Sequence, residues 1–235
     1  MEPTSNRAQE APTARASYME KVTLTTLQKD IFDKVSKDPI LSKQFYFTGG
    51  TALSAFYLHH RESEDLDFFS ETDFEDERIE QLMKNLSISF KTLYRFTKKG
   101  GVRIFEFVKK DKLLIKIDFN HYPYRRVEKG KIYQGIEIDS LRDIAINKLL
   151  TINQRNDVKD FVDLYFLLKD FTIWDLIYGV GEKFRMELDI VLIASDFRKV
   201  EEFDFLPKML VPLKLSDLKD FFKQKAIEIA KRVTE

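Results

Sequence analysis

Two short motifs decide the fold of this chain, FTGGTAL at residues 47–53 and HRESEDLDFF at residues 60–69. The first predicts a strand that ends at Gly49 and Gly50, followed by the start of a helix at Thr51. Glycine lets the backbone approach a ligand closely, and the N–H groups at a helix start face outward, so this layout suits the binding of a phosphate. A double glycine before a helix is also a common tight turn, and the first motif alone leaves both interpretations open.

The second motif places Asp65 and Asp67 two residues apart in a predicted strand, so both carboxylates point to the same face. Leu66 and Phe68 point to the other face, which favours a strand inside a sheet. The alternative is a solvated strand edge, because residues 61–90 are rich in acidic side chains. Two close carboxylates repel each other unless a cation lies between them, and oxygen ligands of this kind suit Mg²⁺.

A third acid completes a constellation. Alternation along residues 113–119 places Lys116 and Asp118 on one face of another predicted strand. If that strand pairs beside the first, Asp118 joins Asp65 and Asp67, and three carboxylates are enough to hold two Mg²⁺ ions. Taken singly, Asp118 is equally well explained as an aspartate near a strand end.

Working outward, the apolar spacing predicts an α/β (α+β) fold with a mixed sheet followed by a helical carboxy-terminal half. Turn signals near residues 99–101 and 109–111 predict antiparallel hairpins. We expect three segments: a disordered tail at 1–18, a core at 19–140 and a helical domain at 141–235. The expected strands are 45–47, 65–69, 88–96, 102–108, 113–119 and 132–138. The expected helices start near Thr23, at Thr51, at Asp139 or Ser140, at Asn156 or Asp157, and at Ser216.

The composition narrows the class of protein. Of 235 residues 43% are hydrophobic, which is enough to bury a core, and there are no cysteines. A disulfide scaffold, a cysteine-ligated metal site and a cysteine nucleophile are therefore excluded, and the composition fits a reducing compartment. Because no long apolar run and no signal-peptide pattern occur, we expect a cytoplasmic protein with no membrane partner.

The formal net charge of zero hides a local imbalance. Residues 61–90 carry 3 basic and 10 acidic side chains, a net charge of −7, whereas residues 91–135 carry 13 basic and 4 acidic side chains, a net charge of +9. An acidic strand beside a basic region suits a site for Mg²⁺, a triphosphate and an RNA backbone.

The motifs also occur in a characteristic order. They are GGT at 49–51, R-x-S-x-D-x-D at 61–67, Asp118, RD at 142–143 followed by Lys148, then Arg155, KD at 159–160 and DLY at 163–165. This order resembles the AbiEii/AbiGii toxin family, nucleotidyltransferase-like proteins of bacterial toxin–antitoxin and phage-abortive systems. The resemblance extends from about residue 24 to residue 222. It departs from the compact superfamily signature only in the longer spacing between Thr51 and Asp65.

The resemblance implies a nucleotidyltransferase-like fold and assigns roles to residues. The implied catalytic residues are Asp65, Asp67, Asp118, Lys148 and Asp160. Those implied to bind the nucleotide are Gly49, Gly50, Thr51, Arg61, Ser63 and Lys148. The implied metal ligands are Asp65, Asp67 and Asp118, with Asp118 also accepting the proton of the acceptor hydroxyl.

The late motif has structural alternatives. Lys148 is also explained as a residue at the edge of helix packing, and Asp160 as part of a capping arrangement with Asp157. The resemblance implies that Asp160 and Asp163 orient Lys148 or contact the acceptor, and Asp163 is also explained by a surface pair with Lys159.

The function implied by the resemblance is Mg²⁺-dependent transfer of a nucleotidyl group from an NTP to a hydroxyl. RNA, including the 3′ end of tRNA, is one acceptor class, and a cognate antitoxin is the expected protein partner. Two alternatives remain open, a nucleotide-binding module without turnover and a phosphotransferase that acts on a protein serine.

Overall fold

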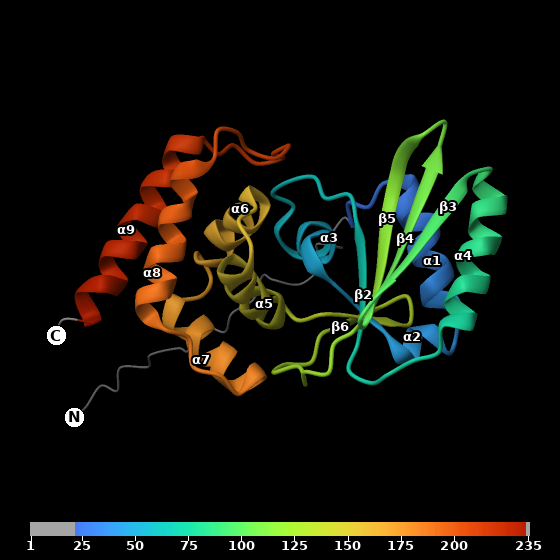
Figure 1. The fold of residues 1–235 in the computed structure, drawn as a ribbon, viewed down its shortest axis with the longest axis horizontal. Helices are drawn as coiled ribbons and strands as arrows, with labels where there is room; N and C mark the ends of the chain where they lie inside the picture. The colour runs from blue at the N-terminus through green and yellow to red at the C-terminus, as the bar shows by residue number, and fades with distance from the viewer. Residues whose placement is uncertain (1–21, 234–235) are drawn as a thin grey trace, which may run out of the picture.

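The computed structural model describes residues 22–233 as a seven-stranded sheet with helices packed on it, followed by a helical carboxy-terminal part (Figure 1). The strands are β1 (Tyr46–Thr48), β2 (Leu66–Ser70), β3 (Leu93–Lys99), β4 (Val102–Lys109), β5 (Lys112–His121), β6 (Lys131–Tyr133) and β7 (Ile136–Ile138). The α-helices are α1 (Thr26–Lys37), α2 (Leu41–Gln44), α3 (Gly49–Leu53), α4 (Asp76–Phe90), α5 (Leu141–Gln154), α6 (Val158–Leu167), α7 (Ile173–Phe184), α8 (Ile190–Arg198) and α9 (Leu215–Val233). A π-helical turn, η1 (Ser54–Leu58), continues α3, and a 3₁₀ turn, η2 (Lys199–Glu202), follows α8.

The strand order β3-β4-β5-β2-β1-β7-β6 makes the sheet mixed. Strand β2 runs parallel to β5 and β1 runs parallel to β7, while the other neighbours are antiparallel. The predicted hairpins on either side of β4 and the α/β fold class are confirmed. In this register Asp67 lies directly beside Asp118, so strands far apart in sequence bring two acids together.

Burial along β2 follows the predicted alternation. Leu66 and Phe68 are fully buried, whereas Asp67 and Phe69 are partly exposed on the opposite face. Helix α1 covers the apolar face, with the ring centroid of Phe32 at 6.4 Å from that of Phe68. The hydrophobic effect thus buries one face of β2 against a helix and leaves the acidic face for a site.

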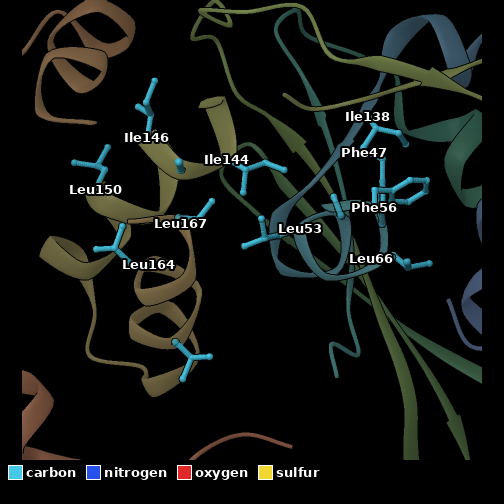
Figure 2. Packing of buried hydrophobic residues seen from close by; sticks show 14 of the residues in the cluster. Phe47, Leu53, Phe56, Leu66, Ile138, Ile144, Ile146, Leu150, Leu164 and Leu167 are labelled. Atoms are coloured by element: carbon cyan, nitrogen blue, oxygen red, sulfur yellow. The ribbon is translucent and has the colours of Figure 1, made fainter. Parts of the chain in front are cut away.

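The core continues from the sheet into the helices (Figure 2). Phe47, Leu53 and Ile138 from the sheet region belong to the same buried cluster as Ile144 on α5 and Leu164 on α6. The expected boundary between residues 140 and 141 falls at the start of α5, and the division into domains stays a prediction. The shared apolar packing fixes where α5 and α6 stand relative to the acidic face of β2.

Two helix starts left open by the sequence are settled by their hydrogen bonds. Ser140 caps α5, its Oγ accepting from the N–H of Asp143 at 2.9 Å, and Asp157 caps α6 by accepting from the N–H of Lys159 at 2.9 Å. The prediction for the last helix is wrong, because Ser216 lies inside α9.

The prediction of one strand over 88–96 is also wrong. Residues up to Phe90 complete α4, and the strand begins only at Leu93. The buried residues Ile79, Met83 and Leu86 recur at helical spacing and carry α4 through this region.

The predicted strand over 132–138 is instead a hairpin of β6 and β7. Gln134 and Gly135 form its turn with φ values of 50° and 88°. Two successive positive φ values are typical of a tight hairpin turn whose twist matches the strands. The predicted disordered tail at 1–18 lies outside the described residues. Within residues 22–233 no helix is long and apolar enough to cross a membrane.

Asp139 directly follows β7 and forms hydrogen bonds to the end of β1 and to the start of α5. Its fully buried carboxylate accepts a hydrogen bond from Thr48 Oγ1 at 2.7 Å and another from the N–H of Ser140 at 3.1 Å. Burial raises the pKa of Asp139 to about 7, although Lys183 opposes the shift. The folded chain therefore holds a proton on Asp139 at pH values where the unfolded chain has lost it.

We predict that stability falls as the pH rises from about 5 to about 8, by on the order of 2 kcal/mol from Asp139 alone. The sign follows from the raised pKa of Asp139, because the folded state binds the extra proton in this range. Urea unfolding of Asp139→Asn should show a smaller decline with pH, while the exposed Asp204→Asn should decline like the wild type. Equal slopes in all three proteins would contradict the assignment.

Candidate active site

A cavity of about 290 Å³ lies between the sheet and helix α5. Its lining comes from the start of α3, from the acidic face of β2, from the end of β5, and from α5 with the residue that follows it. The lining residues that matter for the chemistry are Gly49, Gly50, Asp67, Tyr122, Lys148 and Arg155. Predicted residues from the early and the late motifs therefore meet in one cavity.

The glycine pair lines the cavity, and neither glycine can be replaced by a larger residue. The side chains of Asp67 and Arg61 occupy the space that an added Cβ would need. Gly49 has a φ of +77°, and a Cβ there would lie 2.2 Å from Oδ2 of Asp67. A Cβ on Gly50 would lie 2.7 Å from Nη2 of Arg61. Besides allowing a ligand to approach, the pair therefore lets the first acidic strand and Arg61 pack against the helix start.

The predicted nucleotide-binding residues Thr51, Arg61 and Ser63 contact protein groups here. Thr51 is buried, and its Oγ1 donates to Ser63 Oγ at 2.9 Å and also to the backbone carbonyl of Asp65. The guanidinium of Arg61 binds Asp163 through Nε at 2.7 Å and Nη2 at 2.8 Å. Thr51, Arg61 and Ser63 thus hold the segment that leads into β2, and none of the three lines the cavity.

The two acids Asp67 and Asp118 are neighbours on adjacent strands. Burial raises the pKa of Asp67 to about 7, and the nearby Asp118 adds to the shift. Burial also raises the pKa of Asp118, although Lys116 opposes this. Asp65 lies just before β2, with 47% of its side chain exposed. Desolvation and mutual repulsion make this carboxylate pair a favourable place for an added cation.

The fit to a divalent metal ion can be tested on these groups. Oδ1 of Asp118 is buried without a hydrogen-bond partner, and Asp67 makes neither a hydrogen bond nor an ion pair within residues 22–233. Free carboxylate oxygens of this kind fit Mg²⁺. The described part of the chain nevertheless contains no cluster of three or more acidic or histidine side chains already arranged around one position. The prediction that all three acids bind metal therefore stays a prediction.

Lys116 is a charged residue of this site to which the sequence assigned no role. Its Nζ lies 2.7 Å from Oδ2 of Asp118 and 3.8 Å from Oδ2 of Asp65. Desolvation opposes its charge, but the hydrogen bond to Asp118 and the negative charges of Asp118, Asp65 and Asp67 together raise the pKa of Lys116. The strand alternation placed Lys116 on the face of Asp118, and the ion pair follows from that placement.

Asp163 is the centre of a buried ionic network below the cavity. The carboxylate is fully buried and accepts from Arg61, from His60 Nε2 at 2.7 Å and from Lys148 Nζ at 2.6 Å. Burial would raise the pKa of Asp163, but Lys148 and Arg61 hold it well below its usual range. The surface pair with Lys159 that the sequence left open does not form. Instead, Asp163 on α6 binds the segment before β2 and a lysine on α5.

Lys148 reaches the cavity from α5 while pairing with two acids. Its Nζ lies 2.8 Å from Oδ1 of Asp160 as well as 2.6 Å from Oδ2 of Asp163. Asp160 is itself buried and binds Arg155 through Oδ2 at 2.7 Å from Nε. The side chain of Arg155 stays 60% exposed at the cavity. Asp160 and Asp163 thus orient Lys148, one of the two alternatives that the late motif left open.

Comparison with known proteins assigns the family. A sequence model described as "Nucleotidyl transferase AbiEii toxin, Type IV TA system" matches residues 34–230. The chain belongs to this AbiEii family of nucleotidyl transferase toxins. The match spans both the cavity and the helices that carry the late motif, so the resemblance inferred from the ordered motifs is confirmed.

Individual proteins resemble this chain in sequence or in fold. An uncharacterized protein of Aquifex aeolicus (strain VF5) is 33% identical over 193 residues, which cover 78% of this chain and 80% of that protein. A crystal structure of a candidate nucleotidyltransferase from Helicobacter pylori has a TM-score of 0.55 at 20% identity, covering 88% of this chain and 93% of the other. JHP933 from Helicobacter pylori has a TM-score of 0.54 at 19% identity and covers 88% and 90%. Both structures share the fold of the AbiEii chain.

We predict that Asp163→Ala destabilises the fold by about 3–5 kcal/mol, because it leaves buried cations without their counter-ion. The exposed Asp170→Ala should change the free energy of unfolding by less than about 0.5 kcal/mol. Urea unfolding of the two variants and the wild type measures both values. Similar losses in the two variants would contradict the role given to Asp163.

Proposed function

We propose that this chain transfers a nucleotidyl group from an NTP to a hydroxyl acceptor and requires Mg²⁺. One observation carries the proposal: Asp67 of the sheet, whose strand neighbour is Asp118, lines the same cavity as the cations Lys148 and Arg155 of the helical half. A metal-bound triphosphate carries both positive and negative groups, so it needs carboxylates on one side and cations on the other. Membership of a nucleotidyl transferase family supports the same reaction.

Each group has a task in this proposal. The triphosphate lies along Gly49 and Gly50, with the exposed guanidinium of Arg155 and the ammonium of Lys148 offsetting the charge of the leaving pyrophosphate. Thr51, Arg61 and Ser63 position the glycine pair and the first two acids. Asp160 and Asp163 hold Lys148 charged and aimed at the cavity.

Asp65, Asp67 and Asp118 would hold Mg²⁺, which neutralises the phosphates and lowers the pKa of the acceptor hydroxyl. The acceptor oxygen forms a bond to the α-phosphorus, while the bond from that phosphorus to the pyrophosphate oxygen breaks. Oδ1 of Asp118 takes the hydroxyl proton, since this buried oxygen has no other partner.

We propose RNA, including the 3′ end of tRNA, as the acceptor. A groove of about 630 Å³ lies between the segment after β5 and the end of α7. Tyr124 and Phe184 line it with their ring centroids 4.8 Å apart, and the exposed residues Arg125 and Arg185 flank them. Tyr122 lines the catalytic cavity, and its ring centroid lies 4.9 Å from that of Tyr124, so the groove and the cavity are neighbours. Aromatic rings with neighbouring arginines suit stacked bases and phosphates.

The family supports two further parts of the proposal. A toxin of a toxin–antitoxin system acts in the cytoplasm, and its protein partner is a cognate antitoxin. The two alternatives differ from this proposal in which phosphate of a labelled NTP they transfer. A nucleotide-binding module would transfer neither phosphate, and a protein-serine phosphotransferase would transfer only the γ-phosphate.

We predict that Asp67→Asn and Asp118→Asn each lower transfer by about 10²-fold or more, because each removes a charge or a base from the reacting centre. The measurement is incorporation of label from α-labelled NTPs into total RNA with Mg²⁺. The exposed Asp204→Asn serves as the matched control and should retain activity. Label that reaches RNA in the two site variants as efficiently as in the wild type would contradict the assignment, and label only from the γ-phosphate would replace it with phosphotransfer.

We predict that replacing Arg125 and Arg185 together by glutamine weakens RNA binding and makes its salt dependence shallower. Loss of two phosphate contacts on a single strand should reduce the slope of log K against log salt by roughly 1.4. Fluorescence anisotropy at several salt concentrations measures the slope, with the exposed pair Lys109 and Lys110 replaced by glutamine as control. An unchanged slope would place the acceptor elsewhere.

A further inference from the structure

The ammonium of Lys116 lies where a metal ion bound to Asp65 and Asp118 would lie. Its ammonium lies 2.7 Å from Asp118 Oδ2 and 3.8 Å from Asp65 Oδ2, between two of the three carboxylates proposed as metal ligands. The side chain is only 30% exposed, so the ammonium is partly withdrawn from water and held on the acids. A cation of the protein therefore already bridges Asp65 and Asp118.

The third carboxylate differs in its surroundings. Asp67 lies beside Asp118 in the sheet, lines the cavity and makes no ion pair within the described part of the chain. Because Asp65 and Asp67 are separated by one residue at the start of β2, a cation bound to Asp67 remains within reach of the exposed carboxylate of Asp65. Space for a divalent ion is therefore on the Asp67 side of the site.

The charges of these groups limit how many divalent ions the site accepts. Once metal binding has removed any proton from Asp67, the three carboxylates and the ammonium of Lys116 carry a net charge of about −2, which one divalent ion neutralises. A second divalent ion would give a net charge of about +2 and would lie against the ammonium of Lys116, so it would be repelled.

We propose that Lys116 replaces one of the two metal ions, so that the chain binds one divalent ion at Asp65 and Asp67. The ammonium neutralises Asp118 Oδ2 and leaves Oδ1 free to take the hydroxyl proton. This inference rests on the proposed function, since it assumes that the acids bind a metal. It corrects the expectation of a two-metal site with three metal-binding acids, because Asp118 keeps its role as the base but no longer binds the metal.

Counting bound Mn²⁺ by electron paramagnetic resonance and calorimetry tests this inference without any turnover. The wild type should bind one ion per chain, and Lys116→Met should bind two or bind the first at least about tenfold more tightly, because the competing charge is gone. Lys116→Arg keeps the charge and should bind one ion. Lys112→Met, which removes an exposed lysine at the start of the same strand, should also bind one.

The possible results distinguish a failure of the role given to Lys116 from a failure of metal binding itself. Two ions in the wild type, or unchanged number and affinity in Lys116→Met, overturns the role of Lys116 and leaves the metal-binding proposal intact. No ion in any of the four folded proteins overturns metal binding itself. Circular dichroism of each variant confirms folding, and Asp67→Asn should abolish binding if the wild-type ion lies where we place it.

Discussion

The ionic network around Asp163 is the constraint on which the site depends. Its carboxylate is fully buried and is paired with Arg61, His60 and Lys148, which come from the loop before β2 and from α5. A buried charge is tolerated only while its partners stay in place, because removing one leaves the others uncompensated. The network therefore fixes the distance between the sheet and helices α5 and α6, and with it the width of the cavity between them.

This constraint extends to the glycine pair and the acids. The guanidinium that binds Asp163 also lies so close to Gly50 that a Cβ there would be 2.7 Å from Nη2 of Arg61. Gly49 is limited in the same way by Asp67. The glycine motif, the first two acids and the late motif thus form one geometry, in which a change at any of them moves the others.

Much of the fold follows from local patterns in the sequence. Alternation in β2 and helical spacing in α5 and α6 predict elements whose burial matches, whereas in β5 the match fails at Leu113, which is exposed, and at Asp118, which is buried. The errors occur where one apolar pattern fits two structures, as at residues 88–90, which are the end of α4 and not a strand. The hairpin of β6 and β7 was missed because its turn has Gln134 before Gly135, where the most distinctive turns have Asn or Asp. Sheet order, which places Asp67 beside Asp118, depends on long-range packing that no local pattern encodes.

The site was predicted in composition but not in its charge balance. The sequence identifies acids by their spacing, yet it cannot say which charges they meet, because those partners depend on the register of separate strands and on helix packing. Lys116 was visible on the face of Asp118, but its contact with Asp65 requires that β5 lie beside β2. Because the ammonium of Lys116 neutralises part of the negative charge, the capacity for divalent ions depends on the charge that remains and not on the number of carboxylates. A count of acidic residues therefore overstates metal capacity wherever a lysine shares their face of the sheet.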